Sequence, residues 1–575
     1  MAGEEGAPEC NSCQEINRRK RSVNCASCRL AHHLTCVGLT RIQADAITRW
    51  RCPTCLGRRE GEAQLDAHPP IDLVHYITQC IENRRTMRII PRGAIISVAD
   101  ALHQLLEQAM RESSPLAWGK LLSFGLCALK QPSDATGSED RSISLTTRVK
   151  RQVQEFLQMD RLTLPEKIDH KSSKNGDKDL KLKRNVAAKF ADGDLKGAVR
   201  LLASSEGVAP RDDNTLRLLK LKHPPSPADL ALPDPPGEDD ALPAVAGEED
   251  IRKALSSFRP GSAGGPDGLR PGHLLALVSR KAAEAGVRLL SSLTEFVNLL
   301  LRGEVPEFAK SIIYGANLSG LEKKDNGVRP VAVGSTFRRL AMKVGAKPLS
   351  AEIGESLRPV QLGYSTRGGC EAAAHAARKY LSGVTQRKVL FKVDMANAFN
   401  SIRRDIFLAE AKRRSPGLYR MLWQAYSGSS TLFYGGTNLV SATGIQQGDP
   451  FGPALFSMGI DSLVQRLEAE FNVWYLDDGT IGDSPEKVIS CIRGLIVDLR
   501  EVGLEFNQRK CELTMLNHTR DEALQTEVMF REFLPELKVV PISNASLLGA
   551  PLTVEGISAV IREKREDLER MTYRL

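Results

Sequence analysis

The first 55 residues carry the feature that most restricts how this chain can fold, because cysteine and histidine recur there in four close pairs. Two residues separate the members of each pair: Cys10 and Cys13, Cys25 and Cys28, His33 and Cys36, Cys52 and Cys55. Eight such ligands fill two tetrahedral zinc sites. A segment this short buries too little apolar surface to fold alone, so bound metal must supply folding free energy. The sequence therefore predicts a two-zinc module over residues 1–60.

The ligand order resembles that of a PHD finger, with four cysteines, one histidine and three cysteines. Trp50, two residues before Cys52, matches the tryptophan of that family. The resemblance implies interleaved sites, with the first and third pairs on one zinc and the second and fourth pairs on the other. His32 is an alternative ligand, although the spacing to Cys36 favours His33. A RING finger is the main competing interpretation, but its usual ligand order differs.

A PHD-like finger implies a chromatin or other protein ligand. Trp50 is the only aromatic residue of the module, so we do not expect an aromatic cage for methyl-lysine. The run from Arg18 to Arg21 makes one loop basic. A solvated loop is the default interpretation of such a run, with nuclear targeting or nucleic-acid contact second.

Bulk properties limit the class of protein. The formal net charge is +9, from 79 basic and 70 acidic residues, which permits nucleic-acid binding without demonstrating it. The start of the chain is acidic and lacks the apolar core of a secretory signal. No apolar run approaches the roughly 20 residues that span a bilayer. We therefore expect an intracellular protein without a membrane partner, nuclear with a possible cytoplasmic phase.

Acidic residues end two apolar runs in the second half of the chain. Asp394 follows Val389–Val393, and Asp477 and Asp478 follow Phe471–Leu476. Unpaired carboxylates repel each other, and such a group persists mainly where cations lie between its members. Three carboxylates at the ends of two core strands can hold two divalent metals for in-line phosphoryl transfer. A solvated turn is the alternative interpretation of the Asp-Asp pair taken alone.

Further motifs accompany these acids in a fixed order. The series is Asp394, Gly444 to Pro450, Tyr475 to Asp478, and then Gly503, Leu504, Asn507 and Lys510. It resembles the motifs of reverse transcriptases, in particular the polymerases of non-LTR retrotransposons, over roughly residues 246 to 560. The resemblance implies an α+β fold, with right-hand polymerase fingers and palm over residues 251–575. Leu547 to Leu552 resembles the primer-grip hairpin, and we expect the thumb after it to be largely missing.

The resemblance assigns catalytic roles. Asp394 and Asp477 would bridge two Mg²⁺ ions, with Asp478 as a supporting carboxylate. The backbone carbonyl of Met395 would complete a metal shell. Lys510 matches the lysine proposed to protonate the leaving pyrophosphate.

The resemblance also implies which basic side chains bind the nucleotide. Lys323, or Lys324, and Arg329 would approach the triphosphate from the side opposite the metals. Solvated surface charge is the alternative interpretation of these residues.

Three further residues complete the implied nucleotide site. Phe399 matches the steric gate that excludes a 2′-hydroxyl, although a core phenylalanine is the alternative. Gln447 would lie near the template or nucleotide, and Gly448 would allow close backbone approach.

The middle of the chain carries fewer signals. Residues 61–222 read as a partly helical connector, with a capping box at Ser97–Asp100 and a helix near Asp194 to Ala203. Residues 223–250 are rich in proline and acid and read as a linker.

These observations predict an RNA-directed DNA polymerase whose partners are an RNA template, a DNA primer or target, and deoxynucleotides. A catalytically inactive or domesticated protein that binds nucleic acid or chromatin is the alternative. An RNA-templated RNA polymerase is a third hypothesis, which Phe399 disfavours.

Overall fold

The computed structural model divides into two compact units, Met1–Pro70 and Ile71–Leu575. It describes residues 72–131, 143–166, 178–204, 207–323 and 327–574, together with residue 13 and short stretches between residues 21 and 44. In the first unit, strand β1 (Ser22–Asn24) pairs antiparallel with β2 (Ala31–His33), and a 3₁₀ turn (Leu34–Val37) follows.

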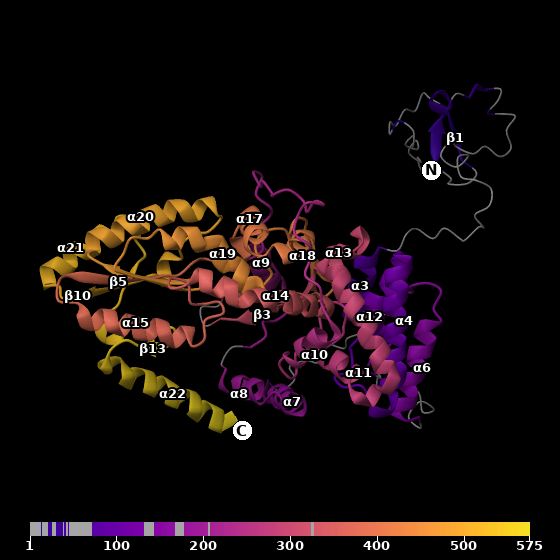
Figure 1. The fold of residues 1–575 in the computed structure, drawn as a ribbon, viewed down its shortest axis with the longest axis horizontal. Coiled ribbons are helices and arrows are strands. Elements are labelled where there is room, and N and C mark those ends of the chain that lie inside the picture. The colour runs from indigo at the N-terminus through magenta and orange to yellow at the C-terminus, as the bar shows by residue number, and fades with distance from the viewer. Residues whose placement is uncertain are drawn as a thin grey trace, which may run out of the picture. The chain divides into compact units, whose positions relative to one another are not determined.

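Helices build the first part of the larger unit (Figure 1). They are α3 (Leu73–Asn83), α4 (Ile95–Glu112), α5 (Pro115–Cys127), α6 (Leu145–Leu157), α10 (Glu248–Ser256), α11 (Pro271–Leu277), α12 (Ala283–Leu301), α13 (Glu307–Ile313) and α14 (Thr336–Leu357). Helix α4 packs against α12, α5 and α6. Phe296 of α12 contacts the rings of Trp118 and Phe337, at centroid distances of 5.5 and 5.1 Å, so α5 and α14 share its core. The expected capping box at Ser97 is wrong, because a 3₁₀ turn (Arg92–Ala94) leads directly into α4 at Ile95.

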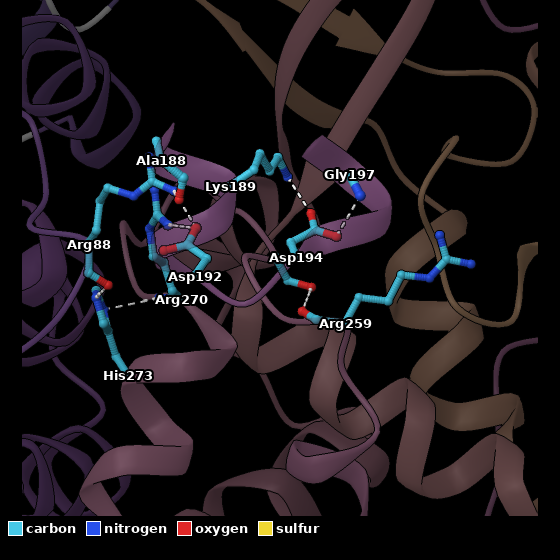
Figure 2. A network of polar contacts seen from close by, with 10 residues as sticks. Arg88, Ala188, Lys189, Asp192, Asp194, Gly197, Arg259, Arg270 and His273 are labelled. Carbon is cyan, nitrogen blue, oxygen red and sulfur yellow. Dashed lines mark hydrogen bonds and ion pairs between the residues drawn. The ribbon is translucent and has the colours of Figure 1, made fainter. Parts of the chain in front are cut away.

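A helical hairpin of α7 (Lys178–Ala191) and α8 (Leu195–Ala203) docks on this bundle through charged groups (Figure 2). The Asp192 carboxylate pairs with Arg88 and with Arg270, and the Arg88 guanidinium also donates to the Ala188 carbonyl at 2.7 Å. The helix expected near Asp194 is confirmed, with the Asp194 side chain accepting the Gly197 N–H at 2.9 Å.

Residues 223–247 pack against the protein rather than running free as a linker. They connect α9 (Asp213–Leu221) to α10 and contact α17 (Arg404–Arg414) and α18 (Pro416–Tyr426). Arg403 pairs with Asp229 at 2.7 Å, and the Tyr419 hydroxyl donates to the Asp234 carbonyl at 2.7 Å. Acidic side chains of this segment pair with basic ones of the protein, since Asp240 also pairs with Lys412 at 3.5 Å.

A four-stranded sheet has the order β4-β3-β6-β7. Its strands are β3 (Ala316–Glu322), β4 (Val328–Gly334), β6 (Ser430–Tyr434) and β7 (Thr437–Ser441). Buried residues alternate with more exposed ones along β4, so one face packs on the core and the other is accessible.

A five-stranded sheet has the order β11-β10-β5-β9-β8. Its strands are β5 (Lys388–Val393), β8 (Phe471–Tyr475), β9 (Asp478–Asp483), β10 (Glu512–Leu516) and β11 (Lys538–Val539). Helices α20 (Pro485–Glu501) and α21 (Arg520–Arg531) cover one face, and α15 (Gly369–Gly383) covers the other (Figure 1). Because side chains alternate along β5, Phe391 stacks on Phe530 of α21 while Leu390 packs with Ala373 and Ala377 of α15.

The remaining elements follow these sheets in the chain. They are α16 (Ala398–Ser401), α19 (Gly452–Gln465), the hairpin of β12 (Ser546–Leu547) and β13 (Ala550–Pro551), and α22 (Val554–Arg574). The fold is α+β, as predicted. Among the helices that the structure describes, none combines the length and apolar character that a bilayer requires.

Candidate active site

Strand register places the three predicted carboxylates at the same end of the five-stranded sheet. Val393 of β5 pairs with Gly479 of β9, so Asp394 follows directly beside the β8–β9 hairpin. Tyr475 pairs with Asp478, which leaves Leu476 and Asp477 as a two-residue turn. Such turns need positive φ angles, and Leu476 has a φ of +57°.

The electrostatics of this cluster are unfavourable without a cation. Burial, and then the charge of Asp394, raises the pKa of Asp477. Asp478 reaches solvent, yet partial burial and then the charges of Asp477 and Asp394 raise its pKa to about 6. Lys392 opposes this shift only in part. The ligand oxygens of the three residues do not all lie within 4.8 Å of one another. Carboxylates that raise one another's pKa suit divalent cations such as Mg²⁺, which prefer oxygen ligands.

Asn507 holds Asp394 by both side chain and backbone. Its side-chain amide donates to Asp394 Oδ1 at 2.8 Å, and its backbone N–H donates to the Asp394 carbonyl at 2.8 Å. Met395 forms an isolated antiparallel bridge with Phe506, which ties the same two segments together. The sequence motif included Asn507 but gave it no role, and the structure makes it an orienting partner of Asp394.

Lys510 lies on the same turn as Asn507. It ends a 3₁₀ helix (Gln508–Lys510), is exposed, and its backbone N–H donates to the Asn507 carbonyl at 2.9 Å. The predicted proton donor is therefore anchored to the residue that binds Asp394.

The predicted triphosphate cations lie on the other sheet. Arg329 is exposed on β4 opposite Leu321, and the Lys323 N–H donates to the Gly327 carbonyl at 2.9 Å at the end of the β3–β4 hairpin. Lys324 lies outside the described residues.

The loop that contains Gln447 and Gly448 packs on strand β4. The Ala332 N–H on β4 donates to the Gln447 carbonyl at 3.2 Å. Gly448 has a φ of +119°, and a Cβ there would lie 2.3 Å from the Ala332 carbonyl oxygen. Only glycine can approach β4 this closely. Gly448 therefore lets the loop pack against the strand that carries Arg329.

Phe399 lies at the edge of the core. Its ring is half-buried and stacks on Phe456 of α19, with centroids 4.6 Å apart and planes 17° apart. Its carbonyl accepts the Ile445 N–H at 2.6 Å, just before the Gln447 loop. The stack on Phe456 fixes the plane of the ring.

A buried ion pair anchors the same loop and was not apparent from the sequence. Arg338 of α14 donates to Asp449 Oδ2 at 2.7 Å and to Gln446 Oε1 at 2.7 Å. The Tyr426 hydroxyl donates to Asp449 Oδ2, also at 2.7 Å. The side chains of Arg338 and Asp449 are only 2% and 0% exposed, so the pair is shielded from solvent.

In the first unit, three predicted zinc ligands lie together. The ligand atoms of Cys13, His33 and Cys36 all lie within 4.8 Å of one another. His32, the alternative ligand, is buried opposite Val23 and lies outside this group. Cys25 is described and also lies outside this group. Cys10, Cys28, Cys52 and Cys55 lie outside the described residues.

Family models match both the region that contains the three carboxylates and the N-terminal cysteine-rich region. A family model described as reverse transcriptase (RNA-dependent DNA polymerase) matches residues 321–548. A PHD-finger model matches residues 10–55. The first match contains all three carboxylates and the Gln447 loop, and the second contains all eight predicted zinc ligands.

Similar proteins come from retrotransposons. The retrotransposable element SLACS 132 kDa protein of Trypanosoma brucei gambiense is 26% identical over 330 residues, which cover 55% of this chain and 27% of that protein. A Pol polyprotein from the type-1 retrotransposable element R2 of Popillia japonica is 26% identical over 262 residues, covering 43% and 34%. One from the type-2 element R2DM of Drosophila melanogaster is 23% identical over 295 residues, covering 46% and 26%.

This chain therefore spans about a third or less of the length of these relatives. It carries a reverse transcriptase domain of the kind found in non-LTR retrotransposon proteins, together with an N-terminal PHD finger.

Proposed function

We propose that this chain is an RNA-directed DNA polymerase of the non-LTR retrotransposon type, which adds deoxynucleotides to a primer 3′-hydroxyl on an RNA template. The observation that carries the proposal is that Asp394, Asp477 and Asp478 share one end of the five-stranded sheet, although Asp394 lies far from the other two in sequence. The match of residues 321–548 to the reverse transcriptase family supports it.

The donor set fits the catalytic metals of this family. Asp394, Asp477 and Asp478 would hold two Mg²⁺ ions, with the Met395 carbonyl as a further ligand. Bound ions would activate the primer hydroxyl and neutralise the leaving pyrophosphate. Asn507 keeps the Asp394 carboxylate oriented, because it binds both the side chain and the backbone of that residue.

Cations of this chain would serve the triphosphate. Arg329, with Lys323 or Lys324, would pair with phosphate oxygens through charge-assisted hydrogen bonds. Lys510 would donate a proton to the leaving pyrophosphate. The Gln447 loop would support the nucleotide from β4, on which Gly448 is seated.

Phe399 would select the sugar. Its stack on Phe456 keeps the ring from turning aside, so a 2′-hydroxyl would meet a fixed surface. This rigidity supports selection of deoxynucleotides.

The N-terminal finger would bind two structural Zn²⁺ ions and a chromatin or other protein ligand. The grouping of Cys13, His33 and Cys36 supports the first of these sites. A chromatin ligand and the basic run at residues 18–21 favour action in the nucleus.

Primer extension on an RNA template with the zinc-loaded chain and Mg²⁺ tests this function. Extension by the wild type that is lost in Asp477→Ala supports it, while Asp498→Ala, a surface carboxylate change on α20, should extend normally. Extension that survives Asp477→Ala would show that the site is misassigned. A folded wild type that binds the primer-template without extending it would instead favour the inactive, domesticated alternative.

A further inference from the structure

The segment that joins α14 to α15 forms an isolated β-bridge with β8, the edge strand of the five-stranded sheet. Gln361 pairs in parallel with Trp474 of β8, the edge strand. The Trp474 N–H donates to the Val360 carbonyl at 2.7 Å, and the Leu362 N–H donates to the Trp474 carbonyl at 2.8 Å. This segment therefore runs beside the hairpin that carries Asp477.

The Gln361 side chain hydrogen-bonds to the backbone of the β8–β9 turn. Its Nε2 donates to the Leu476 carbonyl at 3.1 Å, and its Oε1 accepts the Leu476 N–H at 2.8 Å. Oε1 also accepts the Gly363 N–H at 3.0 Å. The side chain is fully buried, at 0% exposure, so water cannot replace these bonds. One carboxamide thus satisfies both polar groups of the residue immediately before Asp477.

The held residue has a backbone conformation that needs support. Leu476 has a φ of +57°, which is uncommon for a bulky side chain and persists when the surroundings impose it. Gly363 packs closely against the Leu476 backbone, because a Cβ at Gly363 would lie only 2.4 Å from the Leu476 nitrogen.

We propose that Gln361 is a positioning residue that holds the Leu476–Asp477 turn, so that the Asp477 carboxylate stays at the end of the sheet where Asp394 lies. It would thereby set the affinity of the carboxylate cluster for divalent metal. This inference rests on the proposed function, since it assigns metal binding to the same three aspartates. Gln361 contacts no reacting group, and it acts only through the backbone of Leu476.

Gln361→Met removes the clamp while it keeps the length of the side chain. Loss of a partner that orients metal ligands typically weakens metal affinity roughly 10–100-fold. Asn298→Leu is a matched control on α12. The Asn298 amide donates to the Ala246 carbonyl at 3.2 Å and accepts the Ala246 N–H at 2.7 Å, so it clamps one buried residue in the same way, outside the carboxylate cluster.

Gly363→Ala perturbs the same turn through the backbone and does not depend on how Gln361→Met folds. The added methyl group must displace the Leu476 peptide or the Gln361 carboxamide. Gly494→Ala on α20 is its control, because a Cβ at Gly494 meets no atom within 4 Å.

The test is a Mn²⁺ titration of the full zinc-loaded chain without nucleic acid, with free Mn²⁺ followed by electron paramagnetic resonance. Asp477→Ala identifies the site, and circular dichroism confirms folding of each variant. We expect Gln361→Met and Gly363→Ala to weaken the Asp477-dependent binding roughly 10–100-fold, and both controls to leave it unchanged.

Wild-type affinity in folded Gln361→Met would overturn the role of Gln361 and leave the proposed function intact. If Gln361→Met does not fold, wild-type affinity in Gly363→Ala would overturn it equally. Binding that Asp477→Ala does not alter would instead refute the metal site, and with it the proposed function.

Discussion

Asp449→Asn should destabilise the reverse transcriptase domain more than a single hydrogen bond could explain. Asp449 pairs with Arg338 at 2.7 Å, and the two side chains are 0% and 2% exposed. Removal of one partner from a buried pair leaves the other charge uncompensated, which costs about 3–5 kcal/mol. Tyr426→Phe removes only one hydrogen bond to the same carboxylate, which costs about 1.5–3 kcal/mol.

The two changes should also couple. In the Asp449→Asn background the Tyr426 hydroxyl no longer donates to a charge, so Tyr426→Phe should cost less than it does alone. A coupling free energy of about 0.5–3 kcal/mol is expected for residues in one network. Asp498→Asn is the control, because its pair with Arg466 is exposed and is worth about 0.2–1 kcal/mol.

Urea unfolding followed by circular dichroism and tryptophan fluorescence measures these free energies. Asp449→Asn should lower the midpoint of the domain transition far more than Asp498→Asn. Equal effects of the two changes, or strict additivity of Asp449→Asn with Tyr426→Phe, would refute the view that a shielded charge network anchors the Gln447 loop.

Three further predictions concern other parts of the chain. Phe399→Ala should lower the preference for deoxynucleotides over ribonucleotides by about tenfold or more, measured as a ratio of kcat/KM values, and an unchanged ratio would contradict the gate. Chelation should release two Zn²⁺ per chain and unfold the N-terminal finger, and a stoichiometry of zero or one would contradict the interleaved sites. Burial, and then the charge of Arg270, lowers the pKa of His273 to about 4. The unfolded chain therefore binds more protons between pH 4 and the ordinary value of about 6.5, so stability should fall by up to about 3 kcal/mol as the pH drops through this window. His273→Gln should show a shallower loss in acid unfolding, and an equal loss would count against this assignment.

The hydrogen bonds of His273 also favour its neutral form, in agreement with the lowered pKa. Its Nδ1 accepts the Arg270 N–H at 3.3 Å and its Nε2 lies 3.1 Å from the Arg88 carbonyl, an arrangement that suits the neutral ring (Figure 2). A second ring proton would meet a donor at Nδ1, so protonation would break this contact.

Local sequence signals predicted the elements that depend on local chemistry. Asp394 and the Asp477 pair were expected at strand ends, because an apolar run stops before each of them. Asp194 was expected to begin a helix, and its side chain caps α8. The capping box at Ser97 failed because tertiary packing begins α4 earlier, where Ile95 is buried at 3% exposure.

The long-range contacts that stabilise the candidate site could not be predicted from local sequence signals. Gln361 and Leu476 are 115 residues apart, and Arg338 and Asp449 are 111 apart. No periodicity or spacing rule links positions so distant, because their contact depends on the register of strands and on the packing of α14. A lone glutamine or arginine therefore resembles an ordinary surface residue until the fold is known.

Anomalous diffraction from crystals of the chain with primer-template and Mn²⁺ tests the central claim most directly. The account predicts Mn²⁺ bound between the carboxylates of Asp394 and Asp477, with Leu476 still held by Gln361. Mn²⁺ bound elsewhere, with these two carboxylates too far apart to share an ion, would contradict it.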